Sequence, residues 1–226
     1  MSGRLEGAAL TLGSIAIGAL PFQPWIAPPL SGLEAAALIS LAWSVWLLAR
    51  NRPLGWFVGL AGVALYGVLF WQVQLYGEVG LQAFYFVTSL QAIAIWLRGG
   101  PARQERPVGR LRARWHLFVA ALGLLAWAGL RSLLLERAGA APTWDALTTV
   151  LSVIAHLYLM GRYVESWYLW ITVDLIYVPL YASRGLNFTA GLYAFFLILA
   201  LRGLLTFRAL ADEAESGEPP AAGAAA

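Results

Sequence analysis

Apolar stretches of similar length recur along this chain of 226 residues, separated by short charged or Gly- and Pro-containing breaks. Each stretch approaches the roughly 20 residues that an α-helix needs to cross a bilayer. The pattern predicts seven membrane-spanning helices, at residues 34–50, 54–72, 79–97, 115–135, 145–161, 165–182 and 188–206. The expected fold class is therefore an all-α integral membrane protein.

Three segments lie outside these spans. Residues 1–33 hold an apolar run that is short for a span and is followed by four prolines, so they predict an interfacial helix or an extra span. Residues 98–114 form a linker with six arginines. Residues 209–226 are acidic and rich in Ala, Pro and Gly, which predicts a disordered tail.

The chain matches itself at an offset of 111 residues without a gap. Trp56 then falls on Trp167 and Tyr66 on Tyr177, while residues 80–84 (Gly-Leu-Gln-Ala-Phe) fall on residues 191–195 (Gly-Leu-Tyr-Ala-Phe). This register indicates a duplication. It divides the chain into two three-helix repeats, at 34–97 and 145–207, with a linker helix at 115–135 between them.

The number of helices determines how such repeats are oriented. Three spans are an odd number, so two directly joined units would be inverted, and the extra span restores the same orientation. The prediction is a three-plus-one-plus-three arrangement of parallel repeats. Parallel repeats related by an axis along the membrane normal are a known plan for transporters, whose site lies at the repeat interface.

The sixth predicted span carries a stripe of aromatic and acidic side chains. Trp167, Trp170, Asp174, Tyr177 and Tyr181 recur at spacings that place them on one face of an α-helix. A helix needs no such stripe to remain in lipid. The stripe therefore predicts a binding site for a flat and possibly cationic solute, because indole faces attract cations and stack on rings.

Asp174 is the central residue of this prediction. A carboxylate at the bilayer centre costs at least about 2.5–3.5 kcal/mol, so it should face a cavity or a partner. The alternative is a structural hydrogen bond between helices. At the offset of 111, the positions of Trp170 and Asp174 are taken by Gly59 and Val63 in the first repeat. Divergence at these two positions suits a substrate without two-fold symmetry.

Hydrogen-bonding partners are expected from the third span. Gln82, Tyr85 and Ser89 follow a helical spacing with Thr88 beside them, and Tyr193 is a weaker candidate in the last span. Amide, phenol and hydroxyl groups can bond a sugar or a carboxamide. The alternative role is hydrogen bonding between helices, at roughly 0.6–2 kcal/mol per bond.

Composition and charge agree with a membrane protein. Hydrophobic residues make up 60% of the chain and charged residues only 12%, too few to cover a soluble domain. All fifteen basic residues are arginines, and most lie on one side of the predicted topology. The positive-inside rule makes that side cytoplasmic and places the C-terminus inside. Because the arginines cluster in one loop between spans, nucleic-acid binding is not expected.

Several chemistries lack their residues. The sequence has no Gly-rich phosphate loop ending in Lys-Ser or Lys-Thr, so ATP hydrolysis is not expected. Two distant histidines and no cysteines predict no metal site and no cofactor. We therefore do not expect an enzyme.

Two blocks of sequence resemble the repeats of PnuC-type nicotinamide riboside transporters. The first block runs through residues 59–70 and 81–86, and the second joins residues 167–174 to residues 189–193. The likeness covers roughly residues 34–207. It implies a seven-helix fold related to the SWEET plan, and a homotrimer.

The resemblance also implies an activity. The family facilitates uptake of a vitamin-like substrate across the bacterial inner membrane, and a separate cytoplasmic kinase traps it by phosphorylation. Carried over by position, Trp167 and Trp170 bracket nicotinamide riboside, and Gln82 with its neighbours hydrogen-bonds it. Ser166 stands where many relatives have Asn, which has one hydrogen-bonding arm more.

Other functions remain open at this point. Relatives carry thiamine, riboflavin or deoxynucleosides, and the thiazolium of thiamine is also cationic. A membrane scaffold without a substrate, in which the stripe serves only for packing, is the alternative from another class.

Overall fold

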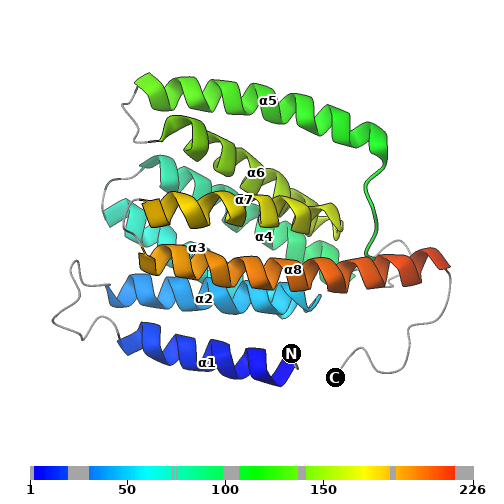
Figure 1. Ribbon diagram of the computed structural model, residues 1–226, viewed down its shortest axis with the longest axis horizontal. Helices are drawn as coiled ribbons and strands as arrows, with labels where there is room; N and C mark the ends of the chain where they lie inside the picture. Colours follow the sequence, from blue (N-terminus) through cyan, green and yellow to red (C-terminus); the bar gives the residue numbers. More distant parts are fainter. Residues whose placement is uncertain are drawn as a thin grey trace. The chain divides into compact units, whose positions relative to one another are not determined.

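The computed structural model describes residues 3–19, 31–72, 74, 76–98, 107–136, 141–183 and 187–216. These residues form eight helices, which Figure 1 shows in chain order: α1 (Gly3–Ala19), α2 (Gly32–Ala49), α3 (Leu54–Gln72), α4 (Tyr76–Arg98), α5 (Ala113–Glu136), α6 (Pro142–Met160), α7 (Glu165–Ser183) and α8 (Asn187–Ser216). Helices α2 to α8 correspond one by one to the seven predicted spans.

Six helices in the described part of the chain are long and apolar enough to cross a membrane: α2, α3, α4, α5, α6 and α8. The protein is therefore a multi-pass, all-α membrane protein. Helix α7 is as long as α3 and α6, but Glu165, Asp174 and its aromatic side chains make it less apolar. The crossing of the membrane by α7 stays a prediction.

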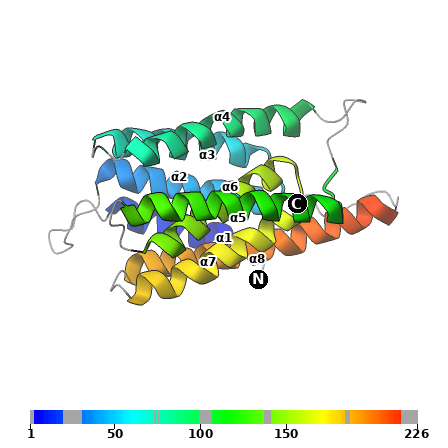
Figure 2. The same cartoon turned by 90° about the horizontal axis from the view of Figure 1, so that it is seen from above.

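The chain divides into two compact units, Met1–Leu97 and Arg98–Ala226. In the first unit, α2 packs against both α1 and α3. In the second unit, packing follows chain order, with α5 on α6, α6 on α7 and α7 on α8 (Figure 2). Helix α5 belongs to the second unit, and the division into two three-helix repeats stays a prediction.

Glycines let α2 and α3 approach closely. A β-carbon on Gly55 would lie 2.6 Å from Leu48 Cγ and 2.9 Å from the Ser44 carbonyl oxygen. The Ser44 hydroxyl donates a 2.8 Å hydrogen bond to the Gly55 carbonyl. Small residues commonly form such helix contacts in membranes, where association depends on close packing and hydrogen bonds across the helices.

The turns that end α2 and α6 have the same backbone geometry at positions 111 residues apart. Asn51 and Arg162 adopt φ angles of 55° and 58°. The residue after each donates to the carbonyl five positions earlier, Arg52 to Leu47 at 2.9 Å and Tyr163 to Tyr158 at 3.0 Å. Both turns are therefore Schellman motifs, which close a helix with a left-handed residue.

Helix α8 continues past its predicted end. The last span was expected to end near residue 206 and a disordered tail to begin at 209, but residues 209–216 are helical. Ala and Glu favour a helix in this stretch, Ala211 is fully buried, and Arg110 pairs with two of its carboxylates. The rest of the predicted tail, residues 217–226, lies outside the described residues.

Helix α1 takes up much of the N-terminal segment. It packs on α2, where the Trp43 indole donates a 2.9 Å hydrogen bond to the Ser14 hydroxyl. Its apolar part, Gly7–Ala19, is shorter than a span. Residues 20–30, with the four prolines, lie outside the described residues, so the choice between an interfacial helix and an extra span stays open.

Helix α5 exposes an apolar surface over its length and has no buried residue. Leu117, Leu124 and Leu125 are 78%, 65% and 71% exposed. Such a surface suits lipid or another apolar partner rather than water. Helix α5 thus forms an outer layer of the second unit.

Candidate substrate-binding site

The two faces of helix α7 differ in exposure. Trp167 and Asp174 on the stripe are buried, whereas Tyr168, Thr172 and Leu175 are exposed. The helix begins at Glu165, directly after the turn that ends α6, so this turn determines which side α7 presents. Trp167 and Asp174 therefore point into the protein, whereas Trp170, Tyr177 and Tyr181 are half-buried.

Trp167 lies flat against the backbone of α8. A β-carbon on Gly203 would lie 2.5–2.6 Å from Trp167 Cδ2, Cε2 and Cε3, a distance that only glycine permits. Phe207, one turn further on, meets the indole edge-on at 5.4 Å between ring centroids and 73° between ring planes. Gly203 and Phe207 thus form the packing surface of Trp167.

The indole N–H of Trp167 is buried, and no residue in the described part of the chain accepts its hydrogen bond. Trp167 as a whole is only 1% exposed. A buried donor left without an acceptor costs about 1–3 kcal/mol, and therefore such groups are usually paired. A substrate oxygen that reached this N–H would remove that cost.

Asp174 is 4% exposed and lies two turns beyond Trp167 on α7. The carboxylate is thus withdrawn from lipid, as its insertion cost requires. Trp170, between the two, is half-buried, so part of its indole surface remains accessible. A carboxylate beside a partly accessible aromatic surface is suited to a planar cation.

Three tyrosines meet beyond Asp174, at the far end of α7. Tyr177 and Tyr181 of α7 lie 5.3 Å apart, and Tyr193 of α8 lies 4.6 Å from the first and 5.3 Å from the second, centroid to centroid. The Tyr181 and Tyr193 rings are stacked, with 13° between their planes. Tyr193, a weak candidate from the sequence, therefore joins the stripe directly, and Tyr181 belongs to the same cluster.

Ser166 is buried at the start of α7, next to Trp167. Its hydroxyl donates a 2.8 Å hydrogen bond to the Tyr163 carbonyl. This bond stabilises the turn and leaves the hydroxyl oxygen only as an acceptor. Ser166 thus contributes to the geometry of the turn that positions the stripe.

The four predicted residues of the third span lie on α4, in the first unit. Thr88 and Ser89 are buried, whereas Gln82 and Tyr85 are half-buried. The Thr88 hydroxyl donates to the Phe84 carbonyl at 2.7 Å, a bond within its own helix. The structure thus brings the α7 and α8 candidates together in the second unit and holds the α4 candidates on a separate helix of the first.

The packing surface of Trp167 has a counterpart in the first unit. Trp56 meets Trp96 edge-on at 5.8 Å and 77°, close to the values for Trp167 and Phe207. Trp96 and Phe207 are 111 residues apart, as are Ala92 and Gly203. Sequence reasoning overlooked Gly203 and Phe207, although the repeat offset applied to the end of the third span would have pointed to both.

Residues 31–209 match the model of a family described as nicotinamide mononucleotide transporter. The chain belongs to this family. The match includes α2 to α7 and α8 as far as Ala209, and therefore contains every residue of the candidate site.

Curated relatives agree with the family. The nicotinamide riboside transporter PnuC of Escherichia coli is 27% identical, over 77% of this chain and 84% of its own length. The PnuC of Neisseria mucosa is 28% identical, over 68% and 61%. The riboflavin/roseoflavin transporter RibM of Streptomyces davaonensis is 30% identical, over 64% and 69%.

A solved structure shares the fold. The crystal structure of the vitamin B3 transporter PnuC superposes with a TM-score of 0.70 and covers 94% of both chains, at 24% sequence identity. At this identity the likeness is one of fold. It supports the helical architecture of the family for this chain as a whole.

Proposed function

We propose that this protein facilitates the uptake of nicotinamide riboside across the bacterial inner membrane. The family is one of transporters, and its members in E. coli and N. mucosa are named nicotinamide riboside transporters. The observation that carries the choice of substrate is the buried Asp174 on the aromatic face of α7.

An ionised Asp174 would favour the riboside over the mononucleotide. Nicotinamide riboside carries a positively charged, planar pyridinium ring, whereas the mononucleotide adds a phosphate and becomes anionic overall. A buried carboxylate attracts the first and repels the second, and both effects are strong where water is excluded. The exposed part of Trp170 would add ring stacking and a cation–π contact.

The residues predicted from the sequence keep their roles in the proposal. On α7 and α8, Trp170, Asp174, Tyr177 and Tyr193 contact the ring, and the Trp167 indole donates to a substrate oxygen. On α4, four residues hydrogen-bond the ribose or the carboxamide: Gln82, Tyr85, Thr88 and Ser89. Ser166 acts indirectly, through the turn before Trp167.

The proposed architecture has seven spans as three plus one plus three parallel repeats, with α5 as the linker helix. Two observations support it. The turns after α2 and α6 share their hydrogen bonds and left-handed residues, and the two aromatic pairs share their geometry, all at one offset. In this arrangement α7 tolerates its polar stripe because the stripe faces the substrate path. Transport would proceed by rocking of the two repeats around the site.

The same proposal includes the orientation of the protein in the membrane, its oligomeric state and the kinase that acts after it. The arginine-rich side and the C-terminus are cytoplasmic. The exposed apolar face of α5 is available for a homotrimer interface or for lipid. A separate cytoplasmic kinase phosphorylates the product, which the anion-repelling site then cannot return.

Ligand titration of the purified protein tests the proposal. Nicotinamide riboside should quench tryptophan fluorescence, and the mononucleotide and thiamine should do so only at much higher concentrations. We expect Asp174→Asn to weaken riboside binding about tenfold or more, because the pyridinium loses its counter-charge. Trp170→Ala should also weaken it, whereas Trp144→Ala, a control at an exposed position of α6, should bind normally. Riboside binding unchanged in both Asp174→Asn and Trp170→Ala would overturn the proposed site.

Riboflavin is a second candidate because a relative of the same family, RibM, is named as its transporter. Riboflavin is uncharged, so its binding would not depend on Asp174. Quenching by riboflavin that persists in Asp174→Asn, with no response to the riboside, would replace the proposed substrate. A protein that responds to no ligand would favour the scaffold alternative.

A further inference from the structure

A short extended segment before α5, residues 107–112, runs along the end of the second unit. Gly109 lies beside the turn between α6 and α7 in a parallel bridge. Its N–H donates to the Arg162 carbonyl and its carbonyl accepts from the Val164 N–H, both at 3.1 Å. Val108 is 4% exposed and anchors the segment by its side chain. We call residues 107–112 the strap.

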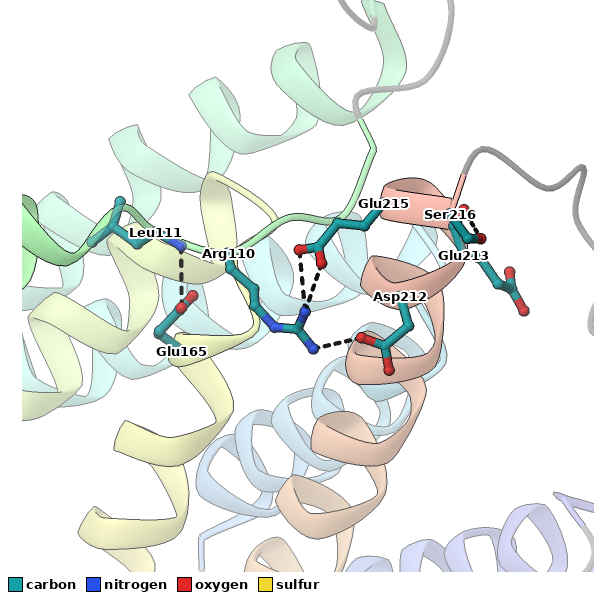
Figure 3. Close-up of polar contacts among 7 residues, drawn as sticks. All are labelled: Arg110, Leu111, Glu165, Asp212, Glu213, Glu215 and Ser216. Atoms are coloured by element: carbon teal, nitrogen blue, oxygen red, sulfur yellow. Dashed lines mark hydrogen bonds and ion pairs between the residues drawn. The ribbon is translucent and has the colours of Figure 1, made fainter.

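Arg110 of the strap reaches the end of α8. Its Nη2 lies 2.6 Å from Asp212 Oδ1, and its Nη1 lies 3.1 Å from both carboxylate oxygens of Glu215 (Figure 3). The hydrogen bond to Asp212 and the charge of Glu215 raise the pKa of Arg110. The guanidinium therefore stays charged at every physiological pH, since the cation would be lost only as the pH rises through this raised value.

The strap also reaches the start of α7. The Leu111 N–H donates to Glu165 Oε1 at 3.1 Å, as Figure 3 shows, and His116 Nε2 lies 3.9 Å from the same oxygen. Glu165 is the first residue of α7 and directly precedes Ser166 and Trp167. The strap thus contacts the turn before α7 by its backbone, the first residue of α7 by an amide, and the end of α8 by a guanidinium.

These contacts surround Trp167 on two sides. The backbone N–H of Trp167 donates to the carbonyl of Val164, and the backbone N–H of Val164 in turn donates to the Gly109 carbonyl. On the other side, Asp212 lies on the same helix as Phe207, little more than one turn beyond the packing surface of the indole. Because the strap contacts both the start of α7 and the end of α8, it limits how far the two helices can separate around Trp167.

We propose that the strap positions Trp167 for substrate, with Arg110 as the positioning residue that ties α8 to α7. The inference rests on the proposed function, because it assigns the strap to the same site. Asp212 and Glu215 lie beyond residues 31–209, the part of the chain that the family model matches. The ion pairs of Arg110 with α8 therefore lie outside the matched region.

The size of the effect follows from exposure. The Arg110 side chain is 39% exposed, and those of Asp212 and Glu215 are 63% and 61% exposed. Ion pairs this exposed are weak singly and are screened by salt, but one guanidinium here joins two carboxylates in a small network. Charge reversal should matter more than neutralisation, because it places three carboxylates together and pushes α8 away from the strap.

The test compares Arg110→Glu with Arg112→Glu, a matched charge reversal at an exposed position of the same strap. We expect Arg110→Glu to raise the Kd for nicotinamide riboside about three- to tenfold, and Arg112→Glu to leave it within twofold. The double variant Arg110→Glu with Asp212→Arg should restore most of the affinity. High salt should narrow the difference in Kd between the wild-type protein and Arg110→Glu, because it screens the ion pairs of the first and the repulsion between carboxylates in the second.

Amide hydrogen exchange provides a readout that does not depend on substrate. Peptides with residues 162–167 should exchange faster in Arg110→Glu than in Arg112→Glu, because the loosened strap frees the Val164 N–H. Equal Kd values in wild type and Arg110→Glu, or affinity that the charge swap fails to restore while exchange recovers, would overturn the inference. If the wild-type protein binds no riboside, the proposed function is wrong. If hydrogen exchange is also unchanged in Arg110→Glu, the proposed role of the strap is wrong as well.

Discussion

Trp167 illustrates how much a single contact decides at this site. The indole is held by a glycine backbone on one side and an aromatic ring on the other, and its buried N–H has no acceptor among the described residues. Glycine is needed at position 203 because the ring occupies the volume of a β-carbon. Any side chain at position 203 should therefore displace the indole.

We expect Gly203→Ala to displace Trp167. The added carbon would lie 2.5–2.6 Å from ring atoms of a rigid indole, so the helices must shift, at a cost of about 1–3 kcal/mol. The melting temperature in detergent and the affinity for nicotinamide riboside should both fall.

The matched control is Gly191→Ala on the same helix, where a β-carbon would meet nothing within 4 Å. This variant should melt at or above the wild-type temperature, because alanine is the better helix former. If Gly203→Ala melts and binds like Gly191→Ala, the described packing of Trp167 is wrong.

At the scale of helices, the α2–α3 contact yields a graded series. Gly55→Ala should destabilise most, by about 1–3 kcal/mol, because its β-carbon meets the immobile Ser44 carbonyl as well as Leu48. A β-carbon on Gly59 would meet only the Ser44 side chain, with the hydroxyl at 2.6 Å and Cβ at 3.4 Å, and the hydroxyl can rotate away by giving up its bond to Gly55. Gly80→Ala on α4 meets nothing within 4 Å and serves as the control.

Thermal unfolding of the three variants checks this order. The melting temperature should fall most for Gly55→Ala, less for Gly59→Ala and not at all for Gly80→Ala. An inverted order would mean that α2 and α3 are further apart than described.

At the scale of the whole molecule, sidedness connects several observations. The strap, the turn before α7 and the end of α8 touch one another, so they lie on the same side of the membrane. Arg110, Arg112, Arg114, Arg162 and Arg208 all lie near these ends. The positive-inside rule then predicts that this whole side is cytoplasmic.

The chain contains no cysteine, so single cysteines can report sidedness. In intact cells, a membrane-impermeant maleimide should label Ala182→Cys, at the exposed end of α7, and leave Ser216→Cys unlabelled until the membrane is opened. Pro107→Cys on the strap should behave like Ser216→Cys. Labelling of positions 182 and 216 from the same side would mean that α8 does not cross the membrane.

The whole molecule also shows how far sequence reasoning reached. Apolar length predicted the order and the approximate bounds of α2 to α8, because a bilayer demands about 20 residues per crossing. The tail was mispredicted over residues 209–216, since its composition resembles a disordered segment. Its helix depends on Ala211, which is buried, and on Arg110, which is about a hundred residues away in sequence.

For the site, the spacing of Trp167, Trp170 and Asp174 already indicated a single face, and the structure shows Trp167 and Asp174 buried. The roles of the α4 residues remain predictions. Helical periodicity tells which residues share a face, but it does not tell what the face meets. The flat contact of Trp167 on Gly203 and the tyrosine cluster depend on the relative register of α7 and α8.

The sequence by itself determined the membrane class, the helices and the stripe, because hydrophobic length and helical periodicity are local properties of a chain. Only the tertiary structure decided which groups are partners: Trp167 with Gly203 and Phe207, and Arg110 with Asp212 and Glu215. Such pairs are chosen by the free energy of packing and by charge between segments far apart in sequence. No spacing along one helix encodes that choice.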